Sequence, residues 1–112
     1  MFAAYETTRN YDQPQETLQV IMEEAVDRYL SLHHTAFPVT RQGLSIVLKL
    51  QKSYRSSGEL LTVSIKNSSF YITSKCIKES SPLIAWGKNR DNVLALASCI
   101  SDASQELFYS AA

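Results

Sequence analysis

The chain has 112 residues, equal numbers of basic and acidic side chains, and a hydrophobic fraction of 45%. These values are typical of one globular domain spanning residues 1–112, and the zero net charge favours neither nucleic acid nor a membrane as partner. No apolar run approaches the ~20 residues of a membrane helix, the first five residues lack the basic start of a signal peptide, and two cysteines do not make a disulfide framework. We therefore expect a cytoplasmic protein.

Residues 1–11 carry three aromatic side chains, Phe2, Tyr5 and Tyr11, among small and polar residues. This pattern fits a frayed terminus, an arm that packs on a partner, or a short extra strand.

The first predicted helix begins after Asp12, which can cap it, with Pro14 in the first turn. It runs to about His33 or His34, ahead of Pro38, and the spacing of Glu24 and Arg28 suits an ion pair on its surface. Its apolar stripe recurs at helical spacing: Leu18, Ile21, Met22, Ala25, Tyr29 and Leu32. The two histidines point apart in regular structure and no other histidine exists, so no metal site is predicted.

Three segments alternate apolar and polar residues, as half-buried strands do: residues 43–51, 59–67 and 69–77. A two-residue loop at Asn67 and Ser68 pairs Ile65 with Phe70 and Val63 with Ile72. A four-residue loop over 55–58 pairs Leu48 with Ile65 and Leu50 with Val63. Both hairpins place one set of residues on a common core face: Leu44, Ile46, Leu48, Leu50, Leu61, Val63, Ile65, Phe70, Ile72, Ser74 and Cys76.

The opposite face of this sheet carries short polar side chains, lysines and a few apolar residues. In the predicted register Lys49, Ser64 and Tyr71 form one row, and Gln51, Thr62 and Thr73 form the next. The residues predicted to form an interaction face are Val47, Lys49, Leu60, Thr62, Lys66, Tyr71, Thr73 and Lys75.

Residues 78–82 are predicted as a turn or loop, followed by a short fourth strand near 82–86 or an apolar loop. Trp86, the only tryptophan, anchors that loop on the core or contacts a partner. The last helix is predicted from Asn89 or Asp91, either of which can cap it. Its apolar stripe consists of Val93, Leu96, Ala97, Ile100, Ser104, Leu107 and Phe108, and both cysteines are interpreted as small buried residues.

The predicted fold is therefore α+β: a helix, a three-stranded antiparallel sheet and a second helix, with both helices on one face of the sheet. The double-stranded RNA-binding domain shares this order of elements. That family's Lys-Lys start of the last helix and its Gly-x-x-His loop are absent, so the chain is not assigned to it.

Charge is distributed unevenly along the chain. Residues 41–90 carry nine basic against two acidic side chains, whereas the segments on either side are acidic. The simplest interpretation is that acidic helices cover a basic sheet whose edge lysines are solvated.

No Gly-rich phosphate loop, nucleophile elbow or sequence-local Cys-His pair is found, and no cofactor is predicted. The leading hypothesis is a non-catalytic protein-interaction module that forms a homodimer through the open sheet face or the helix edges. One alternative is that Lys49, Lys66 and Lys75, with Tyr71 for stacking, bind single-stranded nucleic acid or another polyanion, extended by Lys52, Arg55, Lys78, Lys88 and Arg90. Another is a ligand-binding or enzymatic site formed by residues distant in sequence.

Overall fold

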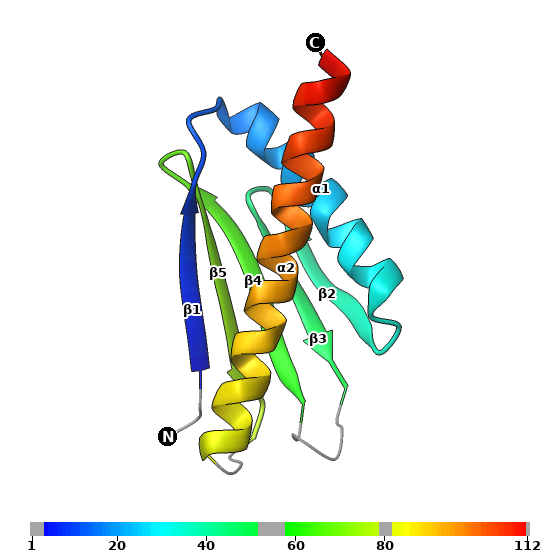
Figure 1. Ribbon diagram of the computed structural model, residues 1–112. Coiled ribbons are helices and arrows are strands. Elements are labelled where there is room, and N and C mark those ends of the chain that lie inside the picture. The colour runs from blue at the N-terminus through cyan, green and yellow to red at the C-terminus, as the bar shows by residue number, and fades with distance from the viewer. Residues whose placement is uncertain (1–3, 52–57, 79–81, 112) are drawn as a thin grey trace.

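The structure is a computed structural model, which describes residues 4–51, 58–78 and 82–111. In chain order the elements are β1 (Ala4–Asn10), α1 (Gln15–Leu32), β2 (Ala36–Gln42), β3 (Ser45–Leu50), β4 (Glu59–Lys66), β5 (Ser69–Cys76) and α2 (Pro82–Ala111). The strands form one antiparallel sheet in the order β1-β5-β4-β3-β2 (Figure 1). Both helices lie on the same side of it, which confirms the α+β class and the one-sided helix layer (Figure 1).

The prediction of three or four strands is wrong, because two edge strands were not counted. Strand β1 occupies residues left open between arm, frayed terminus and strand, and β2 occupies the predicted connection. Both edge strands have weak sequence signals: β1 has Tyr5 as its only large apolar residue, and Pro38 interrupts β2. Proline is tolerated on an edge strand when its nitrogen faces away from the neighbouring strand.

The β4–β5 hairpin has the predicted register, with Ile65 opposite Phe70 and Val63 opposite Ile72. Its turn residues Asn67 and Ser68 have φ of 52° and 59°, as a two-residue type I′ turn requires.

The predicted β3–β4 register is wrong: Leu48 lies opposite Leu61 rather than Ile65, and Leu50 opposite Glu59 rather than Val63. The connection is longer than the four residues predicted, and residues 52–57 of it lie outside the described part. The displacement is an even number of residues, so each side chain keeps its predicted face.

Helix α1 begins at Gln15 behind an extended Pro14, without the predicted side-chain cap from Asp12. It ends at Leu32, as predicted to within a residue or two, and Arg28 pairs with Glu24 at 3.1 Å. Its predicted stripe is buried apart from Leu32, which is 71% exposed.

Helix α2 begins at Pro82, well before the predicted Asn89 or Asp91, and there is no strand near 82–86. Proline is favoured in the first helical position because the amide it lacks would have no partner there. Asn89 is inside the helix and fully buried, so it is not a cap. The predicted stripe is buried from Val93 to Ser104, whereas Phe108 is 41% exposed.

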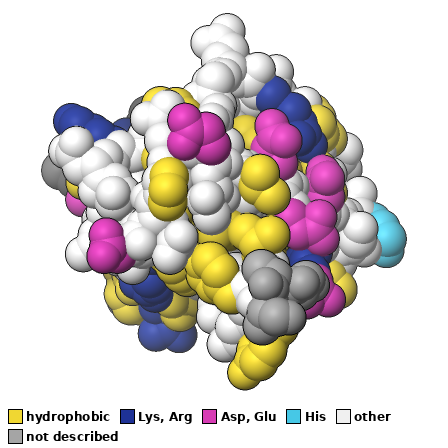
Figure 2. Space-filling model, turned by 90° about the horizontal axis from the view of Figure 1, so that it is seen from above, with side chains coloured by type: hydrophobic (Ala, Val, Ile, Leu, Met, Phe, Trp, Pro, Cys, Tyr) yellow, Lys and Arg dark blue, Asp and Glu magenta, His cyan; other side chains and the backbone are white. Residues whose placement is uncertain are grey.

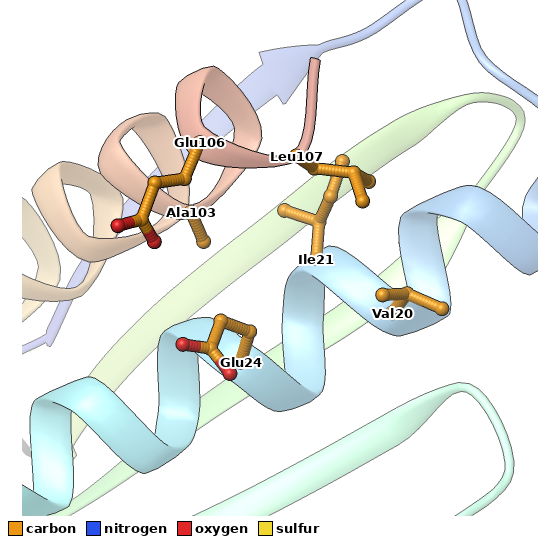
Figure 3. Close-up of a pocket in the computed structure, with 6 residues that line it drawn as sticks. All are labelled: Val20, Ile21, Glu24, Ala103, Glu106 and Leu107. Carbon is orange, nitrogen blue, oxygen red and sulfur yellow. The ribbon is translucent and has the colours of Figure 1, made fainter. Parts of the chain in front are cut away.

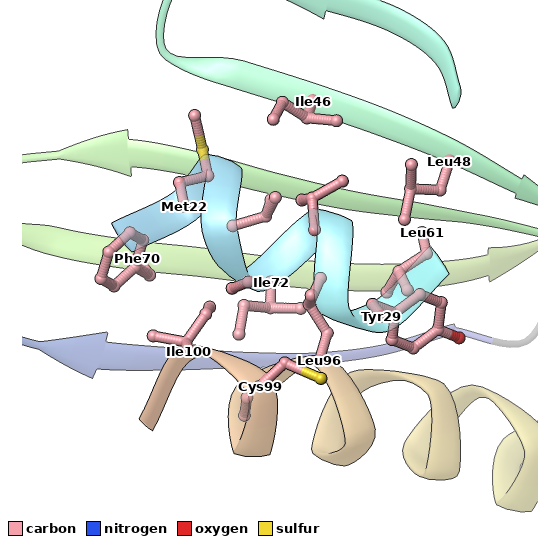
Figure 4. Packing of buried hydrophobic residues seen from close by; sticks show 14 of the residues in the cluster. Met22, Tyr29, Ile46, Leu48, Leu61, Phe70, Ile72, Leu96, Cys99 and Ile100 are labelled. Atoms are coloured by element: carbon pink, nitrogen blue, oxygen red, sulfur yellow. The ribbon is translucent and has the colours of Figure 1, made fainter. Parts of the chain in front are cut away.

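The core lies between the sheet and the two helices, and its buried side chains come from the sheet, from α1 and from α2 (Figure 4). Leu48, Val63 and Ile72 are at most 1% exposed. Ile21 and Met22 from α1 and Leu96 and Ile100 from α2 are equally buried, as predicted for the centre of the fold. Cys76 and Cys99 are both buried, and they do not form a disulfide with each other.

Candidate interaction surface

The side of the sheet away from the helices is the open face, and strand alternation determines which residues it carries. The eight residues predicted as an interaction face all lie on it, in rows that differ from the predicted ones because of the β3–β4 register. The observed rows are Lys49–Leu60–Lys75, Val47–Thr62–Thr73 and Ser45–Ser64–Tyr71, with Lys66 at one end. Strand β1 adds Glu6 and Thr8 to this face, and β2 adds Phe37 and Thr40.

Three large apolar side chains on the open face are substantially exposed: Phe37 and Tyr71 at 40% and Leu60 at 39%. Leu60 lies between Lys49 and Lys75 on the neighbouring strands. Lysine stems lie along apolar surface while the ammonium group stays in water. The row therefore combines an apolar centre with positive charge on either side.

Phe37 was not predicted as part of this face, because Pro38 was interpreted as marking the connection between the first helix and the sheet. In the structure Phe37 pairs with Lys49 across β2 and β3, which continues the row of Leu60 toward the edge of the sheet.

Lys49, Lys66 and Lys75 form no ion pair with any residue in the part of the chain that the structure describes. The described ion pairs lie in the helix layer and at its edge, where Arg28 bonds Glu24 and Glu106 and Arg41 bonds Asp27. Lys52 and Arg55, expected to extend a basic patch, lie outside the described residues. Lys88 and Arg90 belong to α2 rather than to the open face, so the predicted patch is not continuous.

Two neighbouring hollows of the open face share Thr73 and Lys75. One, of about 260 Å³, is lined by Leu60, Thr62, Thr73 and Lys75. The other, of about 290 Å³, is lined by Ala4, Tyr5, Glu6, Thr73 and Lys75. Both are open to solvent, so they suit contact with side chains of a partner better than enclosure of a small molecule.

A further hollow of about 230 Å³ lies between the two helices and is lined by Val20, Ile21, Glu24, Ala103, Glu106 and Leu107 (Figure 3). Glu24 and Glu106 flank its apolar lining, and both bond the guanidinium of Arg28. Seen from the end where α2 terminates, acidic and hydrophobic side chains lie next to each other at the surface (Figure 2). The helix side of the molecule is therefore more acidic than the open face.

A buried polar cluster links α2 to β4 and β5. Asn92 donates to a carboxylate oxygen of Glu59 at 2.8 Å and to the hydroxyl of Ser74 at 3.2 Å. Ser74 donates to the Asn89 side chain at 2.7 Å, and the Asn89 amide donates to the sulfur of Cys76 at 3.4 Å. Glu59, Ser74 and Asn89 are fully buried. This cluster was not predicted from the sequence, because its members lie on three different elements.

Tyr29 lies in the core among the buried side chains (Figure 4), and its buried hydroxyl has no hydrogen-bond partner among the described residues. Burial, then Cys99 and Glu59, raise the pKa of Tyr29 far above its ordinary value. Burial, opposed only in part by Arg28, also raises the pKa of Cys99. Both groups are therefore neutral near pH 7 and lie on the opposite side of the sheet from the open face.

His33 lies where α1 ends, and its ring stacks on Tyr29 with ring centres 4.2 Å apart. Burial lowers the pKa of His33, with smaller effects from Lys88 and His34. Among the described residues, no group of three histidine, cysteine or acidic side chains is arranged to hold a metal ion.

No protein-family model matches the chain, and no curated protein is significantly similar to it. In the described part of the chain, neither helix has the length and apolar character needed to cross a membrane.

Proposed function

We propose that this protein is a non-catalytic protein-interaction module that self-associates and presents its open sheet face to a partner. The observation that carries the proposal is the one-sided helix layer. One side of the sheet is covered by α1 and α2, while the other exposes Phe37, Leu60 and Tyr71. Exposed apolar side chains gathered on one face are typical of protein contact sites.

The chemistry of the open face supports a binding role rather than catalysis. Its described side chains are mostly hydroxyls and lysines, with Glu6 as the one carboxylate and with neither histidine nor cysteine. Acid–base catalysis uses a positioned proton donor and acceptor of matched pKa, and this face offers no such pair among the described residues.

The lysines of the open face make it unsuitable as the contact between two copies of the chain. Face-to-face packing would bring Lys49, Lys66 and Lys75 against the same lysines, with Glu6 as the only described acid on each copy. Like charges brought together at an interface oppose association. The open face therefore suits a partner with negative charge, and self-association is assigned to another part of the sheet.

Light scattering tests the self-association. At tens of micromolar the expected particle has about twice the 12.6 kDa chain mass, and a monomer would contradict the proposal. Leu60→Glu and Tyr71→Glu should leave this dimer intact. If either variant dissociates it, the open face is the contact between copies.

A second candidate function is binding of single-stranded nucleic acid or another polyanion by the open face. The specific observation in its favour is that Lys49 and Lys75, without ion-pair partners among the described residues, flank Leu60. Tyr71 lies on the same face, four residues before Lys75 in β5. Basic grooves with aromatic side chains hold single strands in this way.

Fluorescence anisotropy with short single-stranded and duplex oligonucleotides at two salt concentrations tests this candidate. Binding that weakens with salt, and that Lys49→Gln and Lys75→Gln reduce, supports it. Lys88→Gln removes one charge from α2 and is the matched control. Binding that is absent, or equally weakened by all three variants, argues against it.

A further inference from the structure

We propose that two copies of this chain pair through the free edge of β1, antiparallel and centred on Thr7, so that their sheets join into one continuous sheet. This inference names the contact surface for the self-association proposed above and rests on it. Strand β1 is an edge strand bonded only to β5 in the described structure. An edge strand offers a row of backbone donors and acceptors that a second strand can bind.

One hydrogen bond shows which backbone N–H and C=O groups of β1 point toward β5 and which point outward. The Tyr11 amide donates to the Ser68 carbonyl at 2.9 Å, which continues the β1–β5 register past Asn10. Backbone groups of successive residues in an antiparallel strand point alternately to one side and the other. Tyr5, Thr7 and Arg9 therefore bond β5. The residues whose backbone groups point outward are Ala4, Glu6, Thr8 and Asn10.

The outward residues permit one register over the whole strand. Centring the pair on Thr7 bonds Glu6 to Thr8 of the partner subunit, and Ala4 to Asn10 of the partner subunit, on both sides of the two-fold axis. Centring it on Glu6 places two glutamates directly opposite, which is unfavourable. Centring it on Thr8 leaves Ala4 and Tyr5 without a paired residue. Registers shifted by one residue direct the outward groups of one copy at residues whose groups already bond β5.

Side chains on the helix side of β1 also fit this register, because it places Tyr5 opposite the partner's Arg9 twice. Arginine over an aromatic ring is a favourable contact. Arg9 now donates to the outward carbonyl of Thr8 at 3.3 Å, so this bond gives way when the second strand binds. Tyr5 already contacts Trp86 edge to face, and the guanidinium of Arg90 lies 5.3 Å from the Trp86 ring centre.

The other edge of the sheet, formed by β2, carries features that prevent such pairing, so the proposed contact lies on β1. The Gln51 amide donates to the Thr35 carbonyl. Backbone groups alternate along the strand, so those of Thr35 and Phe37 face β3, whereas those of Pro38 face outward. A bulge between Pro38 and Thr40 breaks the regular edge further. Proline and bulges are the usual means of protecting an edge. The described β1 has neither.

Amide hydrogen exchange, followed residue by residue at low and high protein concentration, tests the geometry directly. The amides of Thr7 and Arg9 should exchange slowly at both concentrations, because they bond β5. The amides of Glu6, Thr8 and Asn10 should become protected only at the higher concentration. Trp86, the sole tryptophan, reports the same step through its emission, since it packs on Tyr5.

Opposite charges at Thr8 provide the mutational test, because this exposed residue would face Glu6 of the partner subunit. Thr8→Glu places like charges opposite each other twice and should weaken the dimer, while Thr8→Lys should strengthen it, each by roughly two- to thirty-fold in Kd. Thr40→Glu and Thr40→Lys on the other edge strand are the matched controls and should leave Kd unchanged. Thr8→Pro removes an outward amide only, and it should give a folded monomer.

The outcomes separate the two proposals. A dimer whose outward amides stay unprotected, or whose Kd responds equally to both Thr8 substitutions, overturns the β1 pairing and leaves self-association in place. A monomer at high concentration overturns both. Alternating protection together with opposite effects of Thr8→Glu and Thr8→Lys supports both.

Discussion

Asn92 is the residue that connects α2 to the polar end of the sheet. Its side-chain amide donates both to Glu59, the first residue of β4, and to Ser74 in β5. Burying a carboxyl group is costly unless hydrogen bonds satisfy it, so the bond from Asn92 is part of what allows Glu59 to be fully buried. The position of Asn92 along α2 thereby fixes where the helix sits over the two strands.

Asn92→Ala should lower the free energy of unfolding by about 1–3 kcal/mol, because buried acceptors lose their donor. Ser98→Ala, an exposed change on the same helix, should stay within about 0.5 kcal/mol of wild type. Urea denaturation measures both. Equal stability of the two variants would mean that the Asn92 contacts do not form in solution.

His33 should make the fold sensitive to mild acid. Its folded-state pKa is below the ordinary value because of burial, so below about pH 6.5 the unfolded chain binds a proton that the folded chain does not. Stability is therefore lost as the pH falls from that value toward the lower folded pKa. Thermal melts of His33→Gln between about pH 7.5 and pH 5.5 should show a smaller loss than wild type.

His34→Gln is the matched control for this measurement, because the neighbouring side chain is exposed. It should retain most of the wild-type acid sensitivity. A full acid response in His33→Gln would assign that response to other groups.

At the scale of elements, alternation along β3, β4 and β5 decides which residues enter the core. Ile72 is fully buried under the helices, while Thr73 is on the open face. Neighbouring residues of one strand should therefore tolerate truncation very differently.

Ile72→Ala should cost roughly 2–5 kcal/mol through lost burial and a cavity, and Val63→Asp should prevent folding because it places a charge in the core. Thr62→Ala and Thr73→Ala should cost under about 1 kcal/mol. Denaturant titration checks these values. Equal damage from Ile72→Ala and Thr73→Ala, at a protein concentration low enough for the chain to be monomeric, would contradict the face assignment.

The sequence predicted those elements whose apolar pattern is strong. The core faces of three strands, the end of α1 and the β4–β5 turn follow from alternation, helical spacing and loop length, and they are confirmed. Strands β1 and β2 were not counted because edge strands bury little and need few apolar residues. The start of α2 was misplaced because Asn89 resembles a cap, whereas its side chain bonds Ser74 and Cys76 across the core.

The candidate surface was predictable as a set of residues but not as a pattern of neighbours. All eight residues share a face because side-chain direction depends only on parity along each strand. Their rows depend on the β3–β4 connection, whose length the polar sequence between the strands leaves open. The pairing of Leu60 with Lys75 follows from the predicted β4–β5 register, whereas the position of Lys49 opposite Leu60 could be seen only in the structure.

At the scale of the whole molecule, the first and last elements close the fold together. Strand β1 completes the sheet next to β5, and α2 packs across both strands before its later turns reach α1 (Figure 1). The ring of Phe70 in β5 contacts the ring of Tyr11, which directly follows Asn10, the last residue of β1. Removing β1 therefore takes away a strand pairing and part of the surface under α2 at once.

A chain lacking residues 1–10 should lose cooperative unfolding, because β5 becomes a bare edge and α2 loses the support of Tyr5 for Trp86. Adding a peptide of residues 1–10 in excess should restore the native Trp86 emission by strand addition. A Thr8→Pro peptide should also restore it, since that residue points away from β5, whereas a Thr7→Pro peptide should fail because it lacks an amide that bonds β5. If both proline peptides behave alike, the assignment of inward and outward residues in β1 is wrong, and the edge pairing built on it falls as well.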